Sequence, residues 1–155
     1  MSKAKFVKIL AMLVAVLSMV FTAPAISLGD QGAEYSPQGS GNVVIIIQSA
    51  DPEVIFFGLL FADRAIKNQW MDNVKVVLWG PAEKTLAGLA PDSDQVKLIK
   101  SIQSTPGKHN RIWCCKACSD RYGVTDKMEK LGFEVFHVGN ATSYLIKLGY
   151  RIWNW

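Results

Sequence analysis

Short runs of apolar residues alternate along the chain with longer segments in which apolar positions recur at helical spacing. The clearest run, Val43–Ile47, has no polar position and is typical of a strand that is buried on both faces. A helix-start signal follows it. Asp51 can cap the first free amides, Pro52 fits the first helical position, and Glu53 complements the positive end of the helix dipole. We expect this helix to extend to about Gln69.

The same alternation continues to the end of the chain. We predict further strands at residues 74–79, 111–114, 133–138 and 150–153, and further helices at residues 82–89, 92–104, 115–131 (interrupted near Gly123) and 141–148. Strands and helices joined in this order by short connections predict a three-layer α/β fold, with a mostly parallel five-stranded sheet and helices on both faces. The folded domain is expected at residues 42–155, with its working site beyond the carboxyl ends of the strands.

The helix that begins after Asp51 is apolar nearly all round. Its large apolar side chains include Phe56, Phe57, Leu60 and Phe61. One face of a sheet cannot cover all of them, so we expect part of this helix to contact another subunit.

Residues 1–29 have the pattern of a secretory leader. Three lysines within the first ten residues precede an uncharged apolar run, Ile9–Phe21, and a segment of small residues, Ala23-Pro24-Ala25. Cleavage after Ala25 fits the small-x-small rule, and cleavage after Gly29 is the alternative.

An uncleaved membrane anchor is the other interpretation of this leader, because Ile9–Leu28 is about long enough to span a bilayer. Contact with a membrane is expected only in that case. Under either interpretation the domain is periplasmic or otherwise exported. Residues 30–41 are rich in glycine and polar residues and predict a flexible linker.

The formal net charge of +4 is concentrated at the amino terminus. Three of the 17 Lys and Arg residues lie in the first ten positions, so the rest of the chain carries 14 basic residues against all 13 acidic ones. The domain is therefore nearly neutral and has no basic stripe, which excludes an electrostatic case for nucleic-acid binding.

The concentrated chemistry of the chain is a cysteine cluster at the end of the predicted third strand. Cys114 and Cys115 should point to opposite sides of the sheet. Cys115 falls where strand becomes helix, a position whose free amides favour a nucleophilic thiolate. Cys118 lies three residues on, so the pair can close a disulfide or exchange one. All three can instead be small buried hydrophobes, the interpretation we favour for Cys114.

The sequence predicts no metal site, because one Cys-x-x-Cys pair supplies two ligands and no second pair has zinc spacing. Neither histidine is expected to be a ligand. His109 is predicted to lie in a solvated loop, and His137 is predicted to lie in a strand with its side chain in the protein core. No Gly-x-Gly-x-x-Gly, Walker loop or Gly-x-Ser-x-Gly elbow occurs, so no cofactor is expected.

The chain resembles the DsrE-like family, which includes subunits of bacterial sulfur-relay complexes. The most telling stretch is residues 115–124, CKACSDRYGV, which is similar to the family's cysteine-containing strand-to-helix segment. The tail at residues 148–152, LGYRI, is similar to the family's closing strand, and the helix start at Asp51 is also similar though less specific.

The resemblance implies a five-stranded α/β domain that assembles as a homotrimer or homohexamer. It also implies a cysteine that accepts sulfane sulfur as a persulfide, and by its position relative to Gly123 that cysteine matches Cys115. Cys118 matches a second cysteine that only some members have. The sulfur-relay members are cytoplasmic, whereas this chain has an export leader.

Three functions follow from these observations. The first is a sulfur carrier, of sulfurtransferase type if it is active, in which Cys115 exchanges sulfur with a donor or acceptor protein or a small thiol. The second is a thiol–disulfide redox protein that uses Cys115 and Cys118. The third is a non-catalytic oligomeric binding or scaffold protein. The first two require that the Cys115 sulfur be ionised and reachable at the mouth of the sheet.

Overall fold

The computed structural model describes residues 41–107 and 111–155. The predicted leader, and the predicted linker apart from Gly41, lie outside these residues. Within the described ranges, no helix combines the length and the apolar character needed to cross a bilayer.

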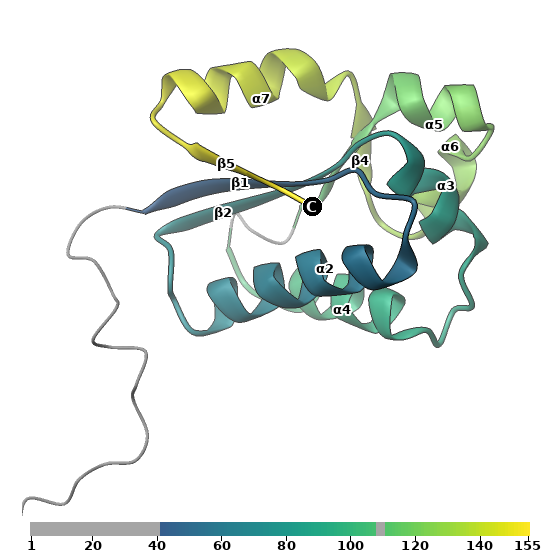
Figure 1. Cartoon of the computed structure of the whole chain (residues 1–155), viewed down its shortest axis with the longest axis horizontal. Coiled ribbons are helices and arrows are strands. Elements are labelled where there is room, and N and C mark those ends of the chain that lie inside the picture. Colours follow the sequence, from purple (N-terminus) through teal and green to yellow (C-terminus); the bar gives the residue numbers. More distant parts are fainter. Residues whose placement is uncertain (1–40, 108–110) are drawn as a thin grey trace, which may run out of the picture. The chain divides into compact units, whose positions relative to one another are not determined.

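A sheet of five strands forms the centre of the domain (Figure 1). Its spatial order is β4-β3-β2-β1-β5, and every neighbouring pair is parallel. The strands are β1 (Asn42–Ile47), β2 (Asn73–Leu78), β3 (Trp113–Cys115), β4 (Glu134–Phe136) and β5 (Arg151–Asn154). The α/β class and the five-stranded parallel sheet predicted from the sequence are thus confirmed.

Six helices are described between the strands. They are α2 (Pro52–Lys67), α3 (Pro81–Gly88), α4 (Asp94–Ser104), α5 (Lys116–Tyr122), α6 (Thr125–Lys130) and α7 (Val138–Lys147). The predicted interruption near Gly123 is confirmed, because Gly123 ends α5 in the left-handed conformation at φ 65°. The predicted strand at residues 133–138 is too long, since β4 ends at Phe136 and α7 already begins at Val138.

The helices cover both faces of the sheet. In Figure 1, α7 lies on one side of β1 and β2, and α2 and α4 lie on the other. Alternate residues of β1 contribute to two separate cores: Val43, Ile45 and Ile47 pack with α2 and α4, whereas Val44 and Ile46 pack with Val138 and the α7 side. This division explains why β1 has no polar position between Val43 and Ile47.

The first turn of α2 is capped as the sequence predicts. Asp51 is the N-cap residue, and its Oδ1 accepts a hydrogen bond of 2.8 Å from the backbone N–H of Glu53. Replacement of an N-cap aspartate by alanine costs about 1 kcal/mol of stability. We expect Asp51→Ala to lower the free energy of unfolding by about that amount in urea denaturation, and Asp51→Asn to stay close to wild type. Equal losses in the two variants would contradict a capping role.

The outer side of α2 leaves large apolar groups in solvent. Phe57 is 51% exposed and Trp70 is 53% exposed, and both line a shallow apolar groove with Trp155. Trp153 stacks on Trp155 at 5.9 Å between ring centroids. The expectation that this helix contacts another subunit remains a prediction.

A sharp turn after β2 positions helix α3 at the carboxyl edge of the sheet. Gly80 has a φ of 68°, which an L side chain rarely adopts, and Pro81 starts α3 directly behind it. The first turn of α3 therefore lies beside the end of β3 and carries Glu83 into the sheet edge. Replacing Gly80 would strain the turn that places this carboxyl group.

Candidate thiol site

The two adjacent cysteines of β3 face opposite sides of the sheet, as strand alternation predicts. Cys114 is fully buried in the core formed with α2, α4 and α6, whereas Cys115 belongs to the core that includes Val138. Cys114 therefore has the packing role that the sequence favoured for it. Its thiol is a core group with a pKa well above the ordinary value, chiefly because of burial and then because of the nearby Glu83 carboxyl group.

Cys115 ends β3 and is the N-cap residue of α5, with no side-chain capping hydrogen bond. The helix that follows has only seven residues, so its dipole is short. Within α5, the Lys116 ammonium pairs with the Asp120 carboxylate at 2.6 Å on the surface. One turn into α5, Cys118 brings a second thiol to the same edge.

The structure places Cys115 deeper than the sequence suggested. Cys115 is only 5% exposed, because it packs in a core with Val138 and neighbouring side chains. Cys118, in contrast, is partly exposed. The more accessible sulfur of the pair is thus Cys118. Both thiols are free, as is Cys114.

Glu83 is the site residue that sequence reasoning missed. It is 0% exposed, and its Oε1 accepts a hydrogen bond of 3.1 Å from the backbone N–H of Cys115. Its Oε2 is buried and has no hydrogen-bond partner. Burial raises the pKa of the Glu83 carboxyl group to about 7, partly offset by the neighbouring Cys114 thiol and Cys115 amide.

Three donor atoms meet at this edge of the sheet. A Glu83 carboxylate oxygen and the Sγ atoms of Cys115 and Cys118 all lie within 4.8 Å of one another. Burial, followed by a hydrogen bond with Cys115, raises the pKa of the Cys118 thiol to about 11. The arrangement can exchange sulfur, close a disulfide, or hold a metal ion through one oxygen and two sulfur donors. We call Glu83, Cys115 and Cys118 the thiol site.

The histidines take no part in the thiol site. His137 was predicted in the core of a strand, but it is exposed and precedes α7 as its N-cap residue. The prediction was wrong because the segment FEVFHV at residues 133–138 passes from strand into helix without a turn signal. His109 lies outside the described residues.

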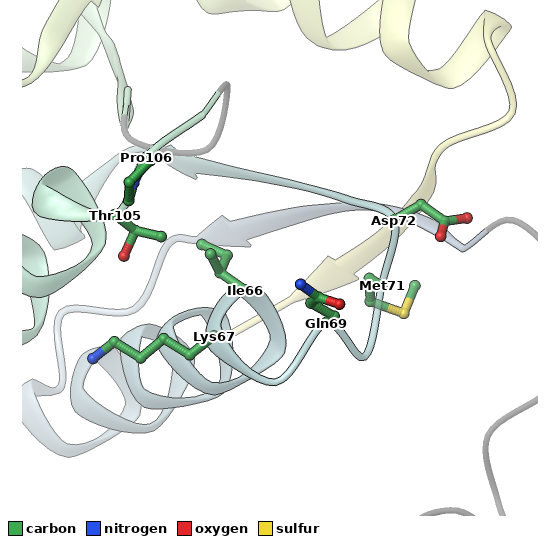
Figure 2. Close-up of a pocket in the computed structure, with 7 residues that line it drawn as sticks. All are labelled: Ile66, Lys67, Gln69, Met71, Asp72, Thr105 and Pro106. Atoms are coloured by element: carbon green, nitrogen blue, oxygen red, sulfur yellow. The ribbon is translucent and has the colours of Figure 1, made fainter.

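A cavity lies at the opposite edge of the sheet. It has a volume of about 590 Å³ and lies between the end of α2 and the start of β2 (Figure 2). Its lining includes Lys67, Gln69, Asp72 and Thr105, and no cysteine. This cavity is therefore separate from the thiol site.

The fold and the site together define the class of this protein. It is a small α/β protein with an all-parallel sheet, and a buried glutamate and two free thiols lie at the carboxyl ends of the strands. The model of the DsrE/DsrF-like family matches residues 41–154, so the chain belongs to that family. The resemblance noted in the sequence is thereby confirmed, and family membership suggests a role in sulfur relay.

A solved structure shares the fold. It is a conserved protein of unknown function from Bacteroides thetaiotaomicron, with a TM-score of 0.60 and 22% sequence identity over 74% of this chain and 95% of that one. No curated protein matches the chain. The likeness to this neighbour concerns the fold alone.

Proposed function

We propose that this protein is an exported sulfur carrier that holds sulfane sulfur as a persulfide on Cys115. The observation that carries the proposal is the convergence of two free sulfur atoms and a buried carboxyl group within 4.8 Å at the sheet edge. Membership of a family with sulfur-relay members supports the same chemistry. The export leader predicted at residues 1–29 supports a periplasmic location.

Loading of Cys115 is a single nucleophilic displacement at the outer sulfur atom of the donor. The Cys115 thiolate attacks the outer sulfur of a donor persulfide, R–S–SH, and a new S–S bond forms as the donor's S–S bond breaks. The products are Cys115–S–SH and the thiolate R–S⁻, so no oxidant or reductant is consumed. An acceptor thiolate takes the outer sulfur by the same reaction and restores the Cys115 thiolate.

The depth of Cys115 limits which donors can react. Cys115 is only 5% exposed, less than the reachable position expected from the sequence, so the proposal is restricted to small donors such as a small persulfide or inorganic polysulfide. Cys118 is partly exposed and adjacent, so once deprotonated it is placed to take the outer sulfur from Cys115 and present it outside. The buried position would also shield a bound persulfide from solvent.

Intact-mass measurement tests the proposal. Reduced protein incubated with inorganic polysulfide and then desalted should gain the mass of one sulfur atom per chain, and a thiol reductant should remove it. A wild-type protein that never gains sulfur, while remaining folded by circular dichroism, would eliminate the carrier function.

Thiol–disulfide exchange is the second candidate, favoured by the proximity of the two free sulfur atoms. Residues three apart on a helix have Cβ atoms about 5–6 Å apart, which is slightly wide for a disulfide but within a small adjustment. Attack of the Cys118 thiolate on the inner sulfur of Cys115–S–SH would give a Cys115–Cys118 disulfide and release hydrosulfide.

Cys118→Ser separates the two candidates. A carrier with this change should still gain one sulfur atom, and it should release no hydrosulfide unless a thiol is added. If the protein is a redox protein, the Cys118→Ser variant should form no disulfide. If the variant gains no sulfur, loading depends on Cys118, and that result would contradict Cys115 as the carrier residue. Cys118 is partly exposed, so the serine variant is expected to fold normally.

A further inference from the structure

We propose that the reduced thiol site also binds one thiolate-preferring divalent metal ion, Zn²⁺, through the Sγ atoms of Cys115 and Cys118 and a carboxylate oxygen of Glu83. The inference goes beyond sulfur carriage, because the sulfur-transfer reaction does not require a metal ion. It rests on how three donors from two separate helix starts converge, with atoms within 4.8 Å of one another.

The donor set suits zinc. Tetrahedral zinc takes sulfur at about 2.3 Å and carboxylate oxygen at about 2.0–2.2 Å, so neighbouring donor atoms around the ion lie roughly 3.5–3.8 Å apart. Closing the site from 4.8 Å therefore requires donor movements of about 1 Å at most. Cys118 is partly exposed on α5 and can supply that movement by rotating its side chain.

The Glu83 carboxyl group supplies an observation that is independent of the cysteines. Its residue is 0% exposed, one oxygen is held by the Cys115 N–H, and the other oxygen is buried with no hydrogen-bond partner. Buried polar atoms in proteins are nearly always partnered, and leaving one unpaired is costly. A metal ion at the thiol site would give Oε2 a partner.

No protein cation takes this place among the described residues. The ion pairs there involve Asp63, Asp94, Glu134 and Asp120, and none involves Glu83. The nearest basic residue in sequence to the thiols, Lys116, is paired with Asp120 on the surface. Among the described residues no ion pair therefore satisfies the Glu83 carboxyl group, and a metal ion from solution, on binding, would take this place.

The surroundings define how the ion enters and how it is held. Trp79, Trp113, Phe136 and Cys118 are all partly buried and pack against the core that contains Cys115, so the site lies between an apolar core and the surface. Three protein ligands leave one position of a tetrahedral ion free, which is the pattern of an exchangeable rather than a closed structural zinc site. Water or a small thiol can fill it.

Metal titration of the purified chain tests this proposal without any sulfur donor. Reduced, chelator-stripped protein is titrated with Cd²⁺, whose thiolate complexes absorb in the ultraviolet, and with Zn²⁺ in competition with a chromogenic chelator. We expect one ion per chain, with a cadmium–thiolate band of two sulfurs. Glu83→Gln should keep the band but weaken Zn²⁺ binding at least tenfold.

Matched variants make the outcome decisive. Cys118→Ser should lose roughly half of the cadmium–thiolate band and most of the affinity, while Cys114→Ser should keep the whole two-sulfur band, because Cys114 supplies no donor atom to the site. Absence of saturable binding in the folded wild type would overturn the proposal, and so would wild-type affinity in Glu83→Gln. Sulfur loading is measured with chelator present, so the carrier function can fail or hold independently.

Discussion

Cys115→Ser should abolish sulfur loading completely, whereas Cys114→Ser should load like wild type. The two positions are adjacent in β3 and both are buried, yet they belong to separate cores on opposite faces of the sheet. Cys114 lies near Glu83, but the cluster of donor atoms within 4.8 Å of one another contains Cys115 and not Cys114. The measurement is the intact mass of each reduced variant after incubation with inorganic polysulfide.

The same pair of variants separates chemistry from folding. Cys114→Ser places a hydroxyl group in a fully buried apolar site, so we expect a loss of stability of about 1–3 kcal/mol without loss of loading. Both variants should therefore be compared at a temperature well below their melting transitions. Loading that survives in Cys115→Ser and disappears in Cys114→Ser would reverse the assignment of the carrier sulfur.

The stability of the reduced, metal-free protein should fall as pH rises from about 4.5 to 7. The pKa of the Glu83 carboxyl group rises from its ordinary value of 4.5 to about 7 on folding, so the folded protein holds this proton more tightly than the unfolded chain does. The contribution to stability is therefore fully present below about pH 4.5 and is lost as pH rises through 7. Its upper bound is about 3 kcal/mol, and solvent relaxation should reduce it to about 1–2 kcal/mol.

Glu83→Gln isolates this contribution. Glutamine keeps an oxygen that can accept the hydrogen bond from the Cys115 N–H but cannot ionise. Urea denaturation between pH 4.5 and 8, with a chelator present, should show a shallower fall in the variant than in wild type. Glu129→Gln, at an exposed position, serves as the control and should follow wild type. Identical pH profiles for wild type and Glu83→Gln would contradict the buried, raised-pKa carboxyl group.

The parts of the fold that the sequence predicted well carry local signals. The five β-branched residues of β1 indicate a strand buried on both faces, and the Asp51-Pro52-Glu53 start of α2 is visible without knowledge of any tertiary contact. The opposite faces of Cys114 and Cys115 follow from strand periodicity alone. These are properties of neighbouring residues, so a sequence displays them directly.

The boundary between β4 and α7 could not be predicted in the same way. The aromatic and β-branched residues between Phe133 and Val138 are typical of one strand. However, α7 begins at Val138 after His137, whose side chain makes no capping hydrogen bond. Without a capping residue or a turn residue, the change from strand to helix leaves no local mark. The misplacement of His137 is a direct consequence.

Two of the three thiol-site residues could be predicted from the sequence, and the third, Glu83, could not. The Cys-x-x-Cys spacing indicated the pair, but Glu83 joins it from 32 residues earlier in the chain. In sequence it looks like any acidic residue in the first turn of a helix. Its position just after Gly80-Pro81, at the end of a predicted central strand, was the available signal. The depth of Cys115 also depends on distant packing, since Val138 shares its core.

The central claim is that the transferable sulfur resides on Cys115, and peptide mapping tests it most directly. Lys116 separates the two site cysteines, so trypsin releases Cys115 and Cys118 on different peptides. Polysulfide-loaded protein is capped with an alkylating reagent, digested and fragmented in the mass spectrometer. We expect an alkylated persulfide at Cys115, on the peptide 112–116. Sulfur found only on the Cys118 peptide, only on Cys114, or on no cysteine would contradict this claim.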